Sequence, residues 1–313
     1  MTVLALAGGV GGAKLANGLA SVLPEGELVI AINTGDDFVH MGLHISPDID
    51  SVTYALAGMN DSARGWGVKD ESWAFMEATR HLGGEGWFNL GDRDLATHVL
   101  RTQLLTKASL SAVTADIAAR LGIRQAIVPM SDDPVRSMIL IDEGEMAFQD
   151  YFVRHQCAPR FRSIRFAGAE TARPSAALVA AFEDPALEAI LLCPSNPILS
   201  IDPILSVPGI RQRIVDRRVP CVALSPFIAG QAVKGPAAKI MTELGLPTTA
   251  NTIARHYEGL IDGLVIDAAD VPGWTGEGPT IHGADILMRN VDQQRALAAQ
   301  MIDFAAVLRR AVP

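Results

Sequence analysis

The stretch Thr2–Lys14, TVLALAGGVGGAK, decides the fold of this 313-residue chain. Its apolar first half is typical of a buried strand, and a glycine-rich turn leads directly into a helical pattern that begins near Ala13. Glycine lets the backbone approach a ligand closely, and a helix N-terminus presents free N–H groups to an anion. The spacing matches neither GxGxxG nor GxxxxGK[ST]. The candidates for phosphate binding here are Gly9, Gly11, Gly12 and Lys14.

Short apolar runs alternate with helical patterns along the rest of the chain. This alternation predicts a Rossmann-like, doubly wound α/β fold with a mostly parallel sheet. Further strands are expected at 28–33, 125–130, 138–141, 164–166, 189–193, 221–224 and 264–266. Helices are expected from Asp92, after Ser109, and over about 292–309. We interpret 1–313 as one unit, with a helical insertion or cap over about 50–121, where no convincing strand is predicted.

Composition excludes several classes of protein. Half of the chain is apolar (49%) and only 19% is charged, which rules out a mainly disordered chain. The formal charge of -9 argues against nucleic acid as a partner, because phosphate contacts need clustered Lys and Arg. No apolar run reaches the roughly 18 residues of a membrane span. Cys157, Cys193 and Cys221 are widely spaced, and we expect reduced core cysteines in a cytoplasmic protein.

Aspartates occur in four close pairs, each at an expected turn or helix start. For any single pair, helix capping and Asx turns are an equally good explanation. Four pairs in a chain so poor in charge favour a cation site, and carboxylate and phosphate oxygens suit Mg²⁺. The pairs are Asp36 and Asp37, Asp48 and Asp50, Asp92 and Asp94, and Asp132 and Asp133. In a parallel sheet the first pair, which follows Asn33 at the end of the second strand, would lie beside the glycine loop.

Small polar residues follow two later strands, where they could hydrogen-bond a base or a phosphate. Ordinary β–α turns with serine caps are the alternative interpretation. These candidates are Ser195, Asn196 and Ser225, with Lys234 and Gly235 in a flexible basic segment beyond them. A cluster of tryptophans, Trp66, Trp73 and Trp87, is expected either to pack in the core or to form an apolar wall for a flat aromatic ligand.

Several segments together resemble the family of 2-phospho-L-lactate transferases of coenzyme F-420 biosynthesis, including their phosphoenolpyruvate-using bacterial relatives. The segments are GGVGGAKL at 8–15, NTGDD at 33–37, SPDIDSVTY at 46–54, RGWGVKDESW at 64–73, LGDRDLATHVLRTQ at 90–103, PMSDDPV at 129–135, FQDYFVR at 148–154, PSNPILSI at 194–201 and SPFIAGQAVKGPAAK at 225–239. Gluconeogenesis-factor-like proteins that bind nucleotide sugars share the glycine loop and the acidic turn. Segments 91–98 and 148–154 favour the transferase branch.

The resemblance implies a Mg²⁺-dependent transferase that acts on small molecules. Its acceptor would be the deazaflavin Fo (7,8-didemethyl-8-hydroxy-5-deazariboflavin), and its donor a guanosine diphosphate ester of a small acid. The terminal ribityl hydroxyl of Fo would attack the phosphorus next to the acid, releasing GMP and forming F-420-0 or its dehydro form. Phospholactate, phosphoenolpyruvate and 3-phosphoglycerate all remain open as the acid. The resemblance also implies a homodimer.

The same resemblance assigns roles to particular residues. Mg²⁺ would bind Asp37 and Asp50, and Asp50, followed by Asp92, is the expected general base. The turn from Asn89 to Arg93, together with Asp50, would face the deazaflavin. The glycine loop with Lys14 would hold the phosphates. From loop position alone, the Ser195–Asn196 and 225–235 segments are the candidates for the guanosine side.

Overall fold

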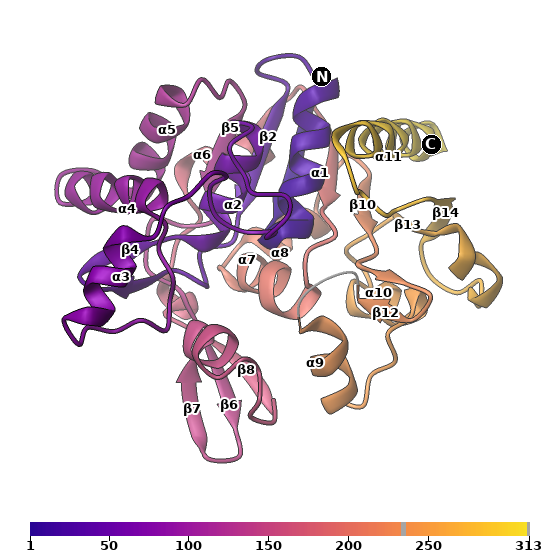
Figure 1. Ribbon diagram of the computed structural model, residues 1–313. Helices are drawn as coiled ribbons and strands as arrows, with labels where there is room; N and C mark the ends of the chain where they lie inside the picture. Colours follow the sequence, from indigo (N-terminus) through magenta and orange to yellow (C-terminus); the bar gives the residue numbers. More distant parts are fainter. Residues whose placement is uncertain (233–235, 312–313) are drawn as a thin grey trace.

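The structure, a computed structural model, describes residues 1–232 and 236–311, and its core is a seven-stranded sheet in which all neighbouring strands are parallel (Figure 1). The strand order is β14-β13-β10-β9-β1-β2-β5. The strands are β1 (Thr2–Ala7), β2 (Leu28–Ile32), β5 (Ala126–Pro129), β9 (Leu187–Leu192), β10 (Cys221–Leu224), β13 (Gly263–Asp267) and β14 (Thr280–Ala284). The expected doubly wound α/β fold is confirmed.

The chain reverses the direction in which it adds strands between β1 and β9. Strands β2 and β5 are added on one side of β1, whereas β9, β10, β13 and β14 are added on the other. The connection that follows β1 therefore runs toward one half of the sheet, and the connection that follows β9 runs toward the other half. Such a switch point leaves a crevice beyond the carboxyl ends of the two strands, which is where open α/β sheets bind ligands.

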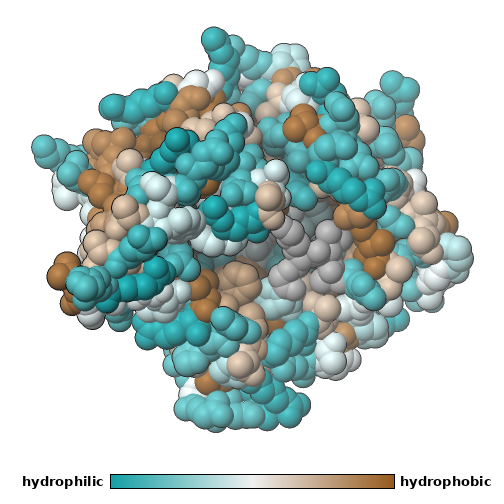
Figure 2. All heavy atoms as spheres, viewed as in Figure 1, coloured by the Kyte–Doolittle hydropathy of each residue, from teal (hydrophilic) through white to brown (hydrophobic). Residues whose placement is uncertain are grey.

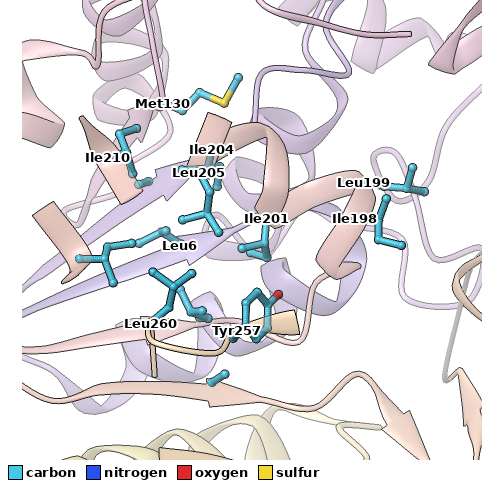
Figure 3. Close-up of a cluster of buried hydrophobic side chains, with 14 of the residues drawn as sticks. Leu6, Met130, Ile198, Leu199, Ile201, Ile204, Leu205, Ile210, Tyr257 and Leu260 are labelled. Atoms are coloured by element: carbon cyan, nitrogen blue, oxygen red, sulfur yellow. The ribbon is translucent and has the colours of Figure 1, made fainter. Parts of the chain in front are cut away.

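Two hydrophobic cores cover the two faces of the sheet. Alternate side chains of β1 point to opposite faces, so Val3 and Ala5 belong to one core, and Leu4 and Leu6 to the other. The first core includes helices α1 (Gly9–Val22), α2 (Pro47–Leu56), α5 (Leu110–Arg120) and α11 (Val291–Ala311). The second includes α6 (Ala176–Glu183), α7 (Asp202–Ser206), α8 (Ile210–Val215), α9 (Ala237–Glu243) and α10 (Ala250–His256), and part of it is drawn in Figure 3.

Residues 47–120 contain helices and no strand longer than a single bridge between Asn60 and Val68. Helix α2 packs on α1 and so belongs to the layer that covers the sheet. It is followed by α3 (Ala74–His81), α4 (Asp92–Leu105) and α5. The expected helix starts at Asp92 and after Ser109 are confirmed. That 50–121 forms an insertion or cap distinct from the rest stays a prediction.

Two expected strands lie outside the main sheet. The sequence assigned 138–141 and 164–166 to the parallel sheet, but they form an antiparallel sheet of order β7-β6-β8 with the unexpected strand β7 (Gly144–Ala147). The physical reason is visible in β6 (Arg136–Ile141), whose residues alternate between more and less buried, so one face is covered and the other is open. Strand β8 spans Ser163–Ala167.

Smaller elements complete the fold, and several were not predicted. Strand β14 at the edge of the main sheet was missed, as were two hairpins. The hairpins are β3 (Phe38–His40) with β4 (Leu43–Ile45), and β11 (Phe227–Ile228) with β12 (Gln231–Ala232). Single helical turns lie at Asp150–Arg154, Ala169–Thr171, Pro197–Ile201 and Ala268–Gly273.

The cysteines and the surface of the protein agree with what the composition predicts. All three cysteines are buried and unpaired, and burial raises the pKa of the Cys193 and Cys221 thiols to about 12, so the expected reduced core cysteines are confirmed. Hydrophilic residues cover most of the face shown in Figure 2. Among the described residues, no helix combines the length and apolar character that crossing a membrane requires.

Close packing of α1 on α11 depends on Gly18. A Cβ at this position would lie 2.3 Å from the backbone oxygen of Gln294, so one helix would have to move. We expect Gly18→Ala to lower the free energy of unfolding by about 1–3 kcal/mol, although alanine is the better helix former. Urea unfolding followed by circular dichroism measures this change. The control is Gly273→Ala, whose Cβ would meet nothing within 4 Å. Equal midpoints for the two variants would contradict the expectation.

Candidate functional site

A cavity of about 610 Å³ lies at the switch point between β1 and β9. Its walls come from the glycine loop, α2, the start of α4, and the segments around 64–67, 148–153, 194–200, 225–226 and 286–288. Residues from most of the segments that the sequence analysis singled out therefore meet in one place. The carboxyl ends of the two central strands bring them together.

A serine hydroxyl fastens the glycine loop to the neighbouring strand. The Gly8 N–H donates to Ser195 Oγ (3.0 Å), and the same hydroxyl donates back to the Gly8 carbonyl (2.8 Å). The loops approach so closely that a Cβ at Gly11 would lie 2.5 Å from the Pro194 oxygen, and one at Gly12 would lie 2.6 Å from Ser195 Oγ. These two glycines are therefore required by packing. Gly11 lines the cavity, whereas Gly12 faces β1 and Ser195.

Asp48 holds the next residue of the loop. The N–H of Gly9, the first residue of α1, donates to Asp48 Oδ1 (2.7 Å), and Asn33 Nδ2 donates to Asp48 Oδ2 (2.9 Å). Burial raises the pKa of Asp48 to about 6. Asn33 Oδ1 accepts a hydrogen bond from the Gly35 N–H (2.7 Å). Through Asp48, the Asn33 side chain therefore connects the end of β2 to the glycine loop. The sequence analysis counted Asp48 among the pairs but gave it no role of its own.

These contacts leave two backbone donors for an anion. Helix α1 begins at Gly9 and not near Ala13, so the glycines form its first turn. The first N–H groups of a helix have no partner within the helix, and those of Gly8 and Gly9 are taken by Ser195 and Asp48. The N–H groups of Val10 and Gly11 remain, and both residues line the cavity. Lys14 lines it too, with its Nζ donating to the Met288 carbonyl (2.8 Å).

The acidic turn after β2 carries buried oxygens that lack partners. Asp37 Oδ2 accepts from Ser46 Oγ (2.9 Å) and lies 3.1 Å from His44 Nε2. The Oδ1 atoms of Asp36 and Asp37 are buried without a hydrogen-bond partner in the described part of the chain. Burial, together with the charges of Asp48 and Asp37, raises the pKa of Asp36 well above its usual range. Oxygens in this state fit a bound cation, which would supply the missing positive charge.

Asp50 belongs to a buried network between α2 and α4. Arg101 pairs with both of its oxygens, Nη1 with Oδ2 at 3.0 Å and Nη2 with Oδ1. His98 and Asp94 complete the group, since ligand atoms of Asp50, Asp94 and His98 lie within 4.8 Å of one another and could hold a metal ion together. Tyr54 donates its hydroxyl to Asp94 (2.6 Å). The sequence analysis missed Arg101 because its helix offers no motif that distinguishes a buried arginine from an exposed one.

The turn before α4 divides into residues inside and outside the cavity. Asn89 lines the cavity and accepts a hydrogen bond from Arg80, whereas Asp92 and Arg93 are not among the lining residues. The Asp92 carboxylate accepts from the N–H groups of Ala74 (3.1 Å) and Phe75 (3.0 Å), the first residues of α3. It therefore caps that helix. Arg93 Nη1 donates to the Lys69 carbonyl (3.4 Å).

The residues that we expected to face the guanosine accept hydrogen bonds from backbone N–H groups of their own loops. Asn196 Oδ1 accepts from the N–H groups of Ile198 (3.0 Å) and Leu199 (3.1 Å), and Ser225 Oγ accepts from the N–H of Phe227 (3.2 Å). Asn196 and Ser225 line the cavity together with Ser195. Lys234 and Gly235 lie outside the described residues.

Several aromatic side chains also line the cavity. Trp66 and Phe88 lie in its wall, as do Phe148 and Phe152, which stack at 5.4 Å between ring centroids. The Arg64 guanidinium lies over Trp66 (5.0 Å) and Trp73 (4.8 Å). Trp87 belongs to a separate group, where it packs edge-on against His40. Trp66 lines the cavity, and Trp73 packs edge-on against it, with 6.0 Å between ring centroids. That these rings form a wall for a flat aromatic ligand stays a prediction.

The fold and the cavity define an α/β protein with donors for an anion, carboxylates for a cation, and an apolar wall for a flat ring. The family model described as "2-phospho-L-lactate transferase CofD" matches residues 3–302. The chain therefore belongs to this family of transferases, as the sequence resemblance predicted.

Similar proteins extend over the same length. A phosphoenolpyruvate transferase of Streptomyces griseus is 38% identical, over 99% of this chain and 100% of its own. A 2-phospho-L-lactate transferase of Methanosarcina mazei is 37% identical, over 95% and 98%. A crystal structure of a upf0052 family protein from Bacillus halodurans has a TM-score of 0.59 at 13% identity, over 96% and 98%, and shares the fold.

Removing the Ser195 hydroxyl tests how much its two hydrogen bonds with Gly8 stabilise the protein. Ser195→Ala leaves the buried N–H and carbonyl of Gly8 without this partner, so we expect the free energy of unfolding to fall by about 1–3 kcal/mol. The midpoint of urea unfolding reports it. Ser163→Ala, on an exposed position of β8, is the control and should stay within about 0.5 kcal/mol of the parent. If the unfolding midpoint of Ser195→Ala equals that of the parent, these two hydrogen bonds do not contribute to the free energy of unfolding.

Proposed function

We propose that this protein transfers a phospho-acid group from a guanosine diphosphate ester to the ribityl hydroxyl of the deazaflavin Fo, releasing GMP in coenzyme F-420 biosynthesis. The observation that carries the proposal is the shared cavity, which is lined by Val10 and Gly11 of the glycine loop, by Asp50 and by several aromatic side chains. Phosphoryl transfer requires positioning and neutralisation of charge, and these groups can supply both.

The donor would bind with its phosphates at the start of α1. Val10 and Gly11 offer N–H groups, the helix dipole favours negative charge there, and Lys14 adds a cation in the first turns. The guanosine would extend toward Asn196 and Ser225 on the β9 and β10 side. Both side chains already bond backbone N–H groups, so recognition there would use their remaining polar atoms and the backbone.

Asp37 and Asp50 would hold the Mg²⁺ that this family resemblance implies. The orphaned Oδ1 of Asp37 and the position of Asp50 in the cavity wall fit an oxygen-liganded cation. When bound, Mg²⁺ would neutralise charge on the transferred phosphoryl group. Arg101 would keep the Asp50 carboxylate oriented, and Asp48 would continue to hold the Gly9 N–H of the glycine loop.

Fo would lie along the aromatic part of the cavity. Its ring system is flat and apolar on its faces, which matches a wall made of Trp66, Phe88, Phe148 and Phe152. Asn89 in the same wall offers an amide to the polar edge of the ring. The family resemblance also brings a homodimer and a cytoplasmic location into the proposal, and light scattering of the purified protein tests the first.

Incubation of the protein with Fo, Mg²⁺ and each of three guanylylated acids tests the proposal. We expect mass spectrometry to show GMP and one F-420-0-type product, made from the phospholactate, phosphoenolpyruvate or 3-phosphoglycerate donor. EDTA should abolish product formation, and omission of Fo should abolish GMP release. Binding of the donor without any GMP release would contradict the proposal and favour a nucleotide-binding regulatory protein of the related branch.

Substitution of Asp50 tests its place in the reaction. We expect Asp50→Asn to bind Fo within about threefold of the parent and to lose at least about a hundredfold in turnover, because the carboxylate charge is lost while the shape is kept. Fo fluorescence measures binding, and GMP release measures turnover. Asp116→Asn, at an exposed position of α5 paired with Arg120, should keep parental turnover. Turnover near the parent for Asp50→Asn would remove this residue from the reaction.

A further inference from the structure

We propose that Asp94 is the catalytic residue that accepts the proton of the attacking hydroxyl, because it is the carboxylate at the α2–α4 end of the cavity with an oxygen left free. The inference rests on the proposed function, since it concerns the acceptor alcohol of that reaction. It differs from the sequence-based expectation, which named Asp50 and then Asp92 for this role.

The contacts of Asp94 leave one of its oxygens available. Its Oδ1 accepts the Tyr54 hydroxyl (2.6 Å) and lies 3.2 Å from His98 Nε2. Its Oδ2 accepts no hydrogen bond from any described residue. The side chain lines the cavity and keeps 11% of its surface exposed. The Tyr54 hydroxyl thus fixes the orientation of the carboxylate through one oxygen, and the other oxygen can receive a proton.

His98 is not available as the base. Arg101 Nη1 lies 3.3 Å from His98 Nδ1, and a guanidinium has only donors, so Nδ1 must present its lone pair to Arg101. The ring proton of the neutral imidazole is then on Nε2, which faces Asp94. His98 therefore has no free lone pair for the substrate.

The remaining polar groups at this end of the cavity are engaged elsewhere. Both oxygens of Asp50 already pair with Arg101, and Asp50 is the carboxylate proposed to hold the cation, so it is engaged without accepting a proton. Tyr54 already donates its hydroxyl, and burial raises the pKa of that phenol well above its usual range, so it stays protonated. Asp92 caps α3 and lies outside the cavity wall. These contacts leave Asp94.

The step balances without any further reactant. The ribityl hydroxyl gives its proton to Asp94 Oδ2 while a lone pair of the hydroxyl oxygen forms the new bond to phosphorus. The bond from that phosphorus to the bridging oxygen of GMP breaks, and its electron pair stays on the GMP phosphate. Nothing is oxidised or reduced. The protonated Asp94 then returns its proton to solvent when the product leaves.

Asp94→Asn keeps the size of the side chain and an oxygen for the Tyr54 hydroxyl but cannot take up the proton. We expect kcat to fall by at least about a hundredfold while the dissociation constant of Fo changes by less than about threefold. Parental circular dichroism and a parental melting temperature, within a few degrees, show that the variant is folded. A kcat above about a third of the parental value would overturn the proposal.

Chemical rescue separates a proton acceptor from a residue that only maintains the site. In Asp94→Ala, added formate can occupy the vacated space as a substitute carboxylate, so we expect formate to raise kcat by at least about tenfold. The matched variant is Tyr54→Phe, which loses the bond that orients Asp94 but keeps the carboxylate, and formate should not raise its kcat. A folded, Fo-binding Asp94→Ala that formate does not activate would overturn the proposal. Failure of the proposed function is distinguishable, because the parental protein would then release no GMP.

Discussion

The contact between the Ser195 hydroxyl and the Gly8 peptide is the constraint on which the rest of the site depends. Both polar groups of this peptide are buried at the switch point, where they need partners, and one hydroxyl satisfies both. The contact holds the loops after β1 and β9 so close together that Gly11 has no room for a side chain. With Asp48 on the Gly9 N–H, it fixes the start of α1, whose next two residues, Val10 and Gly11, line the cavity.

Charge inside the cavity is compatible with the anionic donor that we propose, although the formal charge of the protein is -9. The buried carboxylates near the phosphate site are partly offset by Arg101, which is 1% exposed and pairs with Asp50, and by the N-terminus of α1. Asp36 and Asp37 retain oxygens without partners, which is the condition that a divalent cation relieves. The net charge of the whole chain is therefore a poor guide to the electrostatic potential inside the cavity. It counts the buried carboxylates together with exposed ones such as Asp133, which pairs with Arg173.

Sequence reasoning reached the sheet and the segments that form the cavity, because continuous apolar strands and glycine turns depend on local residue order. It placed β6 and β8 in the wrong sheet, because a short apolar run does not reveal whether its second face is covered. It could not tell which aspartates of the four pairs line the cavity and which cap a helix. Asp92 and Asp94 are two residues apart in one helical turn, yet one caps α3 and the other lines the cavity. That difference is set by tertiary contacts, of Asp94 with Tyr54 and of Asp92 with the start of α3, which the sequence alone does not show.

A crystal structure of the protein with GMP tests most directly whether the switch-point cavity is the phosphate site. The account predicts that phosphate oxygens lie at hydrogen-bond distance, about 2.7–3.2 Å, from the backbone nitrogen of Val10 or Gly11. Phosphate bound elsewhere, with the first turn of α1 empty, would contradict it. The polar hollow lined by Arg255, Tyr257 and Thr280, next to the amino ends of β10, β13 and β14, is a second concave surface among the described residues where such binding would be seen.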